Sequence, residues 1–147
     1  MKPSRLPLVV TVLVMAFFYL PIVILVVNSG SSSIKYQIID PDTEERLAKG
    51  LIERVGTDRG KIVHTGPDAE KREMERPVLD HIAGFAAMLE TCARFDPDLD
   101  EVPIAAVGHR VVQEGARFVQ PTRITDAVIA AIEELSPLAP LHNPPNL

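Results

Sequence analysis

Two apolar runs joined by a short stretch of small polar residues constrain the fold of this chain more than any other feature. The first run, residues 22–27, is rich in β-branched side chains and predicts a buried strand. The second, residues 34–39, alternates apolar and polar side chains as a half-buried strand does. Only Asn28, Ser29, Gly30 and three further serines separate the runs. A connection this short predicts an antiparallel hairpin, which we expect at the edge of a sheet.

Further strands are predicted along the chain. The runs 46–55 and 61–65 are bounded by glycine and predict a third and a fourth strand. Residues 67–76 carry many charges of both signs, which is typical of a solvated connector. A short apolar run at 102–107 predicts a buried strand. From Ile22 onward the pattern therefore predicts an α/β or α+β domain.

Apolar spacing predicts two helices. Over residues 78–94 apolar side chains recur every three or four positions, so they share one face, which we expect to pack on the sheet: Leu79, Ile82, Ala86, Leu89 and Ala93. Thr125 suits the N-cap of a second helix, with Asp126 in its first turn, and this helix ends at Pro137. Its expected inward side chains are Val128, Ile132 and Leu135.

Composition narrows the classes of partner and compartment. The chain carries 15 Lys and Arg against 20 Asp and Glu, a formal net charge of −5, and has no basic cluster. We therefore expect no nucleic-acid partner. Cys92 is the single cysteine and lies within an apolar helical pattern. It predicts a buried structural thiol rather than a reactive one, which fits a reducing compartment.

The N-terminal segment supports two interpretations. Residues 6–27 contain no charge and follow Lys2 and Arg5, which indicates a membrane span with a cytoplasmic N-terminus. Pro21, however, divides this run into residues 6–20, which alone are short for a span, and the strand-like run that follows. The second piece cannot be both a strand and part of a membrane helix.

The serine-rich loop has the chemistry of an anion site. Small residues expose backbone N–H groups and hydroxyls, here those of Ser31 and Ser33, without a large side chain to keep phosphate oxygens away. Asn28 supplies a neutral oxygen suited to a magnesium ion or its waters, and Lys35 adds a positive charge beyond the loop. The alternative is a polar hairpin turn without a ligand, since the spacing is not that of a Walker loop.

Four segments resemble those of one enzyme family. "NSGSSSIKY" closely resembles the first phosphate loop of the acetate kinase family, within the superfamily of sugar kinases, heat-shock ATPases and actin. "AVGHRVVQEG", "TRIT" and "LAPLHNPPNL" resemble further segments of that family, in the same order and at similar spacing. The resemblance covers about residues 22–147. It implies a ribonuclease-H-like, actin-like ATPase fold of which this chain is a partial N-terminal domain.

The resemblance implies reversible phosphoryl transfer from ATP to acetate, with Mg²⁺, giving acetyl phosphate and ADP. It places Asn28 near the metal and Lys35 near the nucleotide phosphates. Arg110 then grips the substrate carboxylate, Val112 lines an apolar pocket for the acetate methyl, and His142 lines the same cleft. These residue types suit the chemistry, because phosphoryl transfer needs positioning and distributed positive charge more than a nucleophilic side chain. Acetate and propionate remain equally open as substrates.

Two histidines and one segment depart from the family pattern. His64 and His81 match nothing in the family and are expected to be structural or exposed. Gln113 and Glu114 stand where the family usually has His-Gly, which puts a charged side chain in place of a permissive glycine.

The family's chain continues beyond its "APLHNP" segment into its catalytic acid, a further histidine and arginine, a second phosphate loop and a second domain. We expect residues 22–147 alone to be inactive, because such kinases close two domains on ATP. The whole enzyme is expected to be cytoplasmic and homodimeric.

Residues 1–21 match nothing in the kinase family. They loosely resemble the end of the first membrane helix of polyamine-type ABC transporter permeases. A permease-like start joined to a kinase-like body indicates a chimeric reading frame, or a membrane-anchored, non-catalytic module with membrane contact through residues 6–27.

Overall fold

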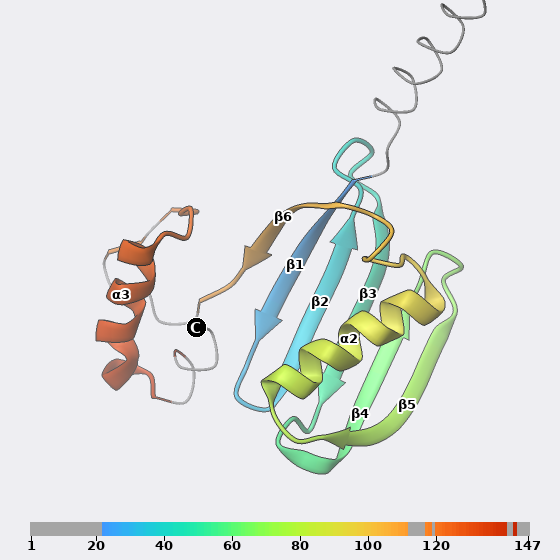
Figure 1. The fold of residues 1–147 in the computed structure, drawn as a ribbon, viewed down its shortest axis with the longest axis horizontal. Coiled ribbons are helices and arrows are strands. Elements are labelled where there is room, and N and C mark those ends of the chain that lie inside the picture. Colours follow the sequence, from blue (N-terminus) through green and yellow to red (C-terminus); the bar gives the residue numbers. More distant parts are fainter. Residues whose placement is uncertain (1–21, 112–116, 119, 141–142, 144–147) are drawn as a thin grey trace, which may run out of the picture.

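The computed structural model describes residues 22–111, 117–118, 120–140 and 143, and these form one mixed sheet with a helix across one face (Figure 1). The sheet has six strands in the order β5-β4-β3-β2-β1-β6. The elements in chain order are β1 (Val23–Ser29), β2 (Ser33–Ile39), β3 (Arg46–Glu53), β4 (Thr57–Thr65), β5 (Lys71–Val78), α2 (His81–Phe95), β6 (Ile104–His109), α3 (Asp126–Leu135) and the 3₁₀ turn η1 (Ser136–Leu138). This arrangement confirms the predicted α/β class.

β1 lies inside the sheet because it has a strand on each side. It pairs antiparallel with β2, and it pairs parallel with β6 in a register that sets Val27 opposite His109. The predicted hairpin is confirmed, but its predicted place at the sheet edge is wrong. The chain returns to β1 only after the crossover through α2, and pairing between strands so distant leaves no local pattern in the sequence.

β5 forms one edge of the sheet, in place of most of the solvated connector predicted over residues 67–76. Its side chains alternate between exposed and half-buried, and it pairs with β4 along most of its length. Lys61 and Lys71 both form ion pairs with Glu73. Charged side chains are common on edge strands because they discourage pairing with another chain. The prediction of a connector is therefore wrong, and the mixed charges belong to an edge strand.

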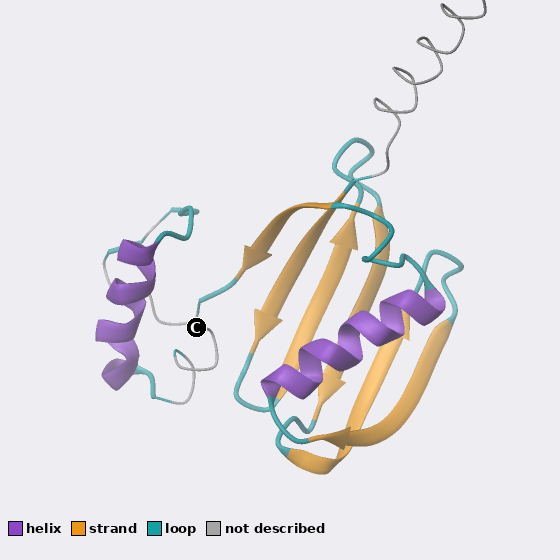
Figure 2. Ribbon diagram, in the orientation of Figure 1, coloured by secondary structure: helices purple, strands orange, loops and turns teal. Residues whose placement is uncertain are grey.

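The core lies between the sheet and α2, which crosses the strands in Figure 2. Each large aliphatic side chain buried there contributes about 1.5–3 kcal/mol. Burial raises the pKa of the Cys92 thiol to about 11, and its burial confirms the predicted structural cysteine. The buried core residues are Val23, Leu25, Val27, Ile34, Tyr36, Ile38, Ala48, Ile52, Val55, Ile62, Val78, Ala87, Met88 and Cys92.

α2 turns a different face to the sheet from the predicted one. A Cβ added at Gly84 would lie 2.6 Å from Cδ1 of Ile34, so the helix sits closer to β2 than alanine would allow. Because α2 lies so close to β2, the side of the helix that carries small residues faces the sheet. The buried residues are Gly84, Ala87, Met88, Thr91 and Cys92. The residues predicted to face inward are exposed instead, Leu79 by 67%, Ile82 by 81% and Leu89 by 46%, together with Ala86 and Ala93.

The strand predicted over residues 102–107 exists as β6, but it is not buried. Every residue from Ile104 to Gly108 is exposed, and within the described ranges no strand pairs with its outer side. α3 follows beyond this edge (Figure 1). It begins as predicted at Thr125, whose side chain accepts a hydrogen bond from the Val128 amide, and it buries Ile132.

The strand interpretation of the apolar N-terminal run is confirmed for residues 23–27, which belong to β1. Because Val23–Ser29 is a central strand, residues 6–27 do not form one membrane-crossing helix. In the part of the chain that the structure describes, no helix combines the length and apolarity of a membrane span. Residues 1–21 lie outside that part.

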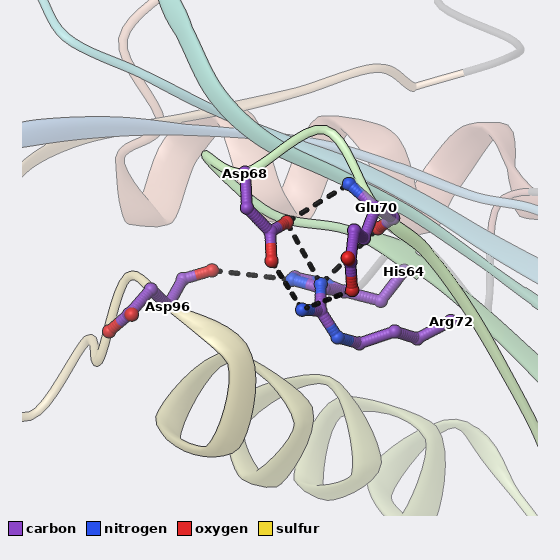
Figure 3. Close-up of polar contacts among 5 residues, drawn as sticks. All are labelled: His64, Asp68, Glu70, Arg72 and Asp96. Atoms are coloured by element: carbon purple, nitrogen blue, oxygen red, sulfur yellow. Dashed lines mark hydrogen bonds and ion pairs between the residues drawn. The ribbon is translucent and has the colours of Figure 1, made fainter.

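A buried polar network ties three neighbouring strands to the end of α2. The Tyr36 ring on β2 crosses Gly50 on β3, and its hydroxyl lies 2.8 Å from Nδ1 of His64 on β4. Nε2 of His64 lies 3.3 Å from the carbonyl oxygen of Asp96, which follows α2 (Figure 3). A carbonyl only accepts, so Nε2 carries the proton and Nδ1 accepts from the Tyr36 hydroxyl. His64 therefore has a structural place in the fold.

The Arg72 side chain stabilises the β4–β5 turn, which lies beside this network. Its guanidinium binds both carboxylate oxygens of Asp68 and one of Glu70 (Figure 3). The guanidinium carbon also lies 4.8 Å from the ring centre of Phe95, the last residue of α2. Hydrogen bonding to Arg72 lowers the pKa of Asp68 to about 2. The turn and the helix end are thereby joined next to His64.

The crossing of Tyr36 over Gly50 leaves no room for a side chain, which gives a first prediction. A Cβ at Gly50 would lie 2.1 Å from Cζ of Tyr36, whereas a Cβ at Gly108 would meet nothing within 4 Å. Gly50→Ala should lower the free energy of unfolding by about 1–3 kcal/mol, and Gly108→Ala should leave it almost unchanged. Urea unfolding followed by circular dichroism measures both, and equal effects of the two changes would contradict the account.

The neutral state of His64 predicts a dependence of stability on pH. Burial lowers the pKa of His64 below its ordinary value of 6.5, so the unfolded chain takes up this proton at a higher pH than the folded chain does. Stability is then complete above pH 6.5 and falls as the pH drops below it, by at most about 1.4 kcal/mol per pH unit for one group.

Urea unfolding at about pH 7.5 and about pH 5.5 should show this loss in the unaltered chain. The loss should shrink in His64→Gln, while the contribution of His109, whose pKa burial also lowers, persists in both proteins. An unchanged loss in the variant would show that His64 does not carry the effect.

Candidate functional site

The serine-rich loop between β1 and β2 is held by backbone hydrogen bonds at two points. The Gly30 amide donates to the Ser33 carbonyl at 2.7 Å, and the Val55 amide donates to the Ser32 carbonyl at 3.0 Å. Within the described residues, the amides of Ser31 and Ser32 donate to no protein acceptor. Both residues are exposed and Ser33 is half-buried. The loop therefore presents free N–H groups and hydroxyls to solvent, as an anion site requires.

Asn28 and Lys35 lie directly opposite each other where β1 and β2 approach the loop. Their neighbours Val27 and Ile34 point into the core under α2, so strand alternation puts Asn28 and Lys35 on the opposite face of the sheet. Both side chains line a cavity of about 480 Å³ on that face, which Lys49 also lines. In the described part of the chain Lys35 forms no ion pair, so its charge is available to an anion.

Arg110 is brought to the same end of the sheet by the parallel pairing of β6 with β1. It follows the last residue of β6, and its amide donates to the Val27 carbonyl at 3.1 Å, one residue before Asn28. Adjacent parallel strands end at the same edge of a sheet. Arg110 and Asn28 therefore lie next to each other at the ends of the paired strands β6 and β1. The Arg110 side chain is exposed, and its planar guanidinium can bind a carboxylate by two parallel hydrogen bonds.

A second cavity of about 390 Å³ lies between the end of β6 and α3. Its lining includes His109 and Val111, the two neighbours of Arg110, together with apolar residues of the segment before α3 and of α3 itself: Phe118, Ile124, Val128 and Ile132. Burial lowers the pKa of His109, which favours its neutral form. Arg110 itself does not line this cavity. A largely apolar hollow suits a small apolar group of a ligand.

The described residues include most of the predicted site, but not all of it. Val112 and His142 lie outside the described ranges, as do Gln113 and Glu114. The structure therefore brings together Asn28, Lys35, Arg110 and the loop serines.

His81, which the sequence predicted to be structural or exposed, contacts the loop. Its Nε2 lies 2.7 Å from the Gly30 carbonyl oxygen. The two residues are separated by 51 positions and belong to different elements, so no local pattern could have revealed this contact.

The metal-binding capacity of the site is small. Among the described residues, no three or more His, Cys, Asp or Glu side chains are placed to hold a metal ion. Asn28 offers one half-buried carboxamide oxygen beside the free amides of the loop. Mg²⁺ usually keeps several waters and takes one or two protein ligands together with substrate phosphates. The residues present therefore fit a magnesium ion that arrives with a nucleotide rather than a separate metal centre.

Comparison with known proteins identifies the family of this chain. The model of the Acetokinase family matches residues 23–147. Similar relatives include the acetate kinase of Clavibacter michiganensis subsp. michiganensis, 57% identical over 83% of this chain and 31% of its own length. The acetate kinase of Thermotoga petrophila is 48% identical over 84% of this chain and 31% of its own length. The chain thus spans about a third of the length of these relatives.

Solved structures of such kinases share the fold. The acetate kinase of Porphyromonas gingivalis superposes with a TM-score of 0.76 and 36% identity, over 84% of this chain and 32% of that one. A propionate kinase from Francisella tularensis gives a TM-score of 0.73 and 32% identity, over 84% of this chain and 31% of that one. These similarities confirm the expected actin-like fold of a partial N-terminal domain. Because the family model spans residues 23–147, the chain belongs to the acetokinase family.

Proposed function

We propose that this chain supplies the phosphate-binding and carboxylate-binding part of an acetate kinase, which transfers a phosphoryl group reversibly between ATP and acetate. The observation that carries the proposal is the pairing of Asn28 with Lys35 beside the free amides of the serine-rich loop. In a hairpin turn without a ligand, nothing would favour an unpaired lysine and the half-buried side chain of Asn28 next to these N–H groups. Residues 1–21 are a separate segment in this proposal.

The loop and Lys35 bind the phosphates of ATP. The amides of Ser31 and Ser32 and the hydroxyls of Ser31 and Ser33 donate to phosphate oxygens, and the Lys35 ammonium offsets their negative charge. Asn28 would hold Mg²⁺ through its carboxamide oxygen. When bound, that ion would offset part of the negative charge of the phosphates.

Arg110 and the second cavity bind the acid. The Arg110 guanidinium orients the carboxylate, and the apolar hollow beside His109 accepts the short alkyl group. One carboxylate oxygen then attacks the γ-phosphorus in line, so that a new O–P bond forms while the bond from the γ-phosphorus to the β,γ-bridging oxygen breaks and ADP leaves with that electron pair. No side chain needs to act as the nucleophile, and the protein contributes alignment and positive charge. Acetate and propionate differ by one methylene. In an apolar hollow, one methylene changes the free energy of discrimination between two substrates by only about 1–3 kcal/mol.

The remaining length of the relatives matters for turnover. In the proposed enzyme, which is cytoplasmic and homodimeric, residues beyond those present here complete the nucleotide cleft and supply further charge to the transition state. The part described here binds and orients its ligands. The cavity at Lys35 lies on the face of the sheet opposite α2, and the second cavity lies between the end of β6 and α3.

Binding of magnesium-ATP to the 147-residue chain tests the proposal. Lys35→Ala should raise the dissociation constant about tenfold or more, because it removes a charge-assisted hydrogen bond worth about 1.5–3 kcal/mol. Isothermal titration calorimetry measures the change.

Lys49→Ala is the matched control for this experiment. Lys49 lines the same cavity, but it lies on β3, one strand further from Asn28 than Lys35 does. Its loss should change the dissociation constant by less than about threefold. Equal weakening by both changes would mean that the face attracts anions by its overall charge and has no phosphate site at the loop.

A further prediction concerns turnover by the chain alone. With ATP, Mg²⁺ and acetate, it should release no ADP above the rate of the buffer, because ligands bound on open cavities are not held in line for transfer. A coupled assay of ADP release checks this, with heat-denatured chain as the blank. Acetate-dependent ADP release that Arg110→Ala abolishes would show that the chain is a complete catalyst.

A further inference from the structure

The serine-rich loop has a third attachment, from a part of the chain that the proposed reaction does not use. The Gly30 carbonyl oxygen lies 2.7 Å from Nε2 of His81, the first residue of α2. A carbonyl oxygen can only accept, so His81 donates through Nε2. The loop is therefore tied to its own hairpin, to Val55 after β3 and to α2.

The contact with His81 sets the direction of one loop amide. In a trans peptide the C=O and N–H bonds point to opposite sides. Because His81 holds the Gly30 carbonyl on the side of α2, the N–H of Ser31 in the same peptide unit points away from the helix. This is one of the two loop amides that donate to no protein acceptor.

The loop has little else to fix that peptide. Gly30 has no side chain and a wide range of backbone conformations, and the exposed serines that follow pack against nothing large. The start of α2 does not need the His81 side chain either, because Asp80 caps the helix by accepting from the Ala83 amide at 2.7 Å. The His81 side chain thus acts on the loop and not on the cap.

We propose that His81 is a positioning residue for phosphate binding, which holds the Gly30–Ser31 peptide so that the Ser31 N–H faces the phosphate oxygens. The inference rests on the proposed function of the loop. It adds a residue on α2 to a site otherwise made from β1, β2 and β6, and it couples the loop to the helix that covers the core.

Three variants of the 147-residue chain separate this role from a general loss of stability. His81→Leu removes the donor, whereas the side-chain nitrogen of glutamine in His81→Gln can occupy the place of Nε2. Asp80→Ala removes the helix cap next door and leaves the contact with Gly30 intact. If the leucine variant does not fold, His81→Asn replaces it, because its shorter side chain does not reach the carbonyl.

Two measurements are made on each protein. The first is the dissociation constant of magnesium-ATP from calorimetry, and the second is the backbone order parameter of the Ser31 amide from ¹⁵N relaxation without ligand. His81→Leu should weaken binding about threefold to tenfold and lower the order parameter of Ser31. His81→Gln should stay within about twofold of the unaltered chain in affinity, and so should Asp80→Ala, with the order parameter of Ser31 preserved in both.

The outcomes distinguish this inference from the proposed function. If the unaltered chain binds no magnesium-ATP, the proposed phosphate site fails, and the order parameters alone decide whether His81 positions the loop. If the unaltered chain binds but His81→Leu binds equally well, the site stands and the role of His81 is overturned. Equal weakening by His81→Leu and Asp80→Ala also overturns it, because helix stability would then explain both.

Discussion

The pairing of β1 with a strand on each side is the constraint on which the site depends. The antiparallel partner β2 sets Lys35 opposite Asn28, and the parallel partner β6 delivers Arg110 beside the end of the same strand. Each partner brings one charge to a loop in which the amides of Ser31 and Ser32 donate to no protein acceptor among the described residues. Without β6, Arg110 would have no fixed relation to the serine-rich loop, so the crossover through α2 is as important to the proposed site as the hairpin.

Local pattern was enough to predict the hairpin, the helix capped by Thr125 and the residues at the loop, because each depends on residues close together in sequence. It failed where pairing or packing is long-range. The charges of β5 indicated a connector, since an edge strand and a solvated loop share the same composition. The side of α2 that faces the sheet was decided by the close contact of Gly84 with Ile34, which helical spacing alone does not reveal.

The same limits apply to the site. Motif resemblance indicated Asn28, Lys35 and Arg110, and the structure puts them at one end of neighbouring strands. The contact between His81 and Gly30 spans 51 positions and carries no motif, so only the fold could show it. Leu79, just before α2, and Ile82 and Leu89 on α2 are exposed in the described residues, in keeping with a chain that spans about a third of its relatives.

The most direct test of the account is a titration of the ¹⁵N-labelled 147-residue chain with magnesium-ATP, followed by amide chemical shifts. The central claim is that phosphates bind where β1, β2 and β6 meet. It predicts the largest shifts at Ser31 and Ser32, with smaller ones at Lys35 and Arg110. Shifts confined to the cavity beside α3, or no shift in the loop when the nucleotide is demonstrably bound, would contradict it.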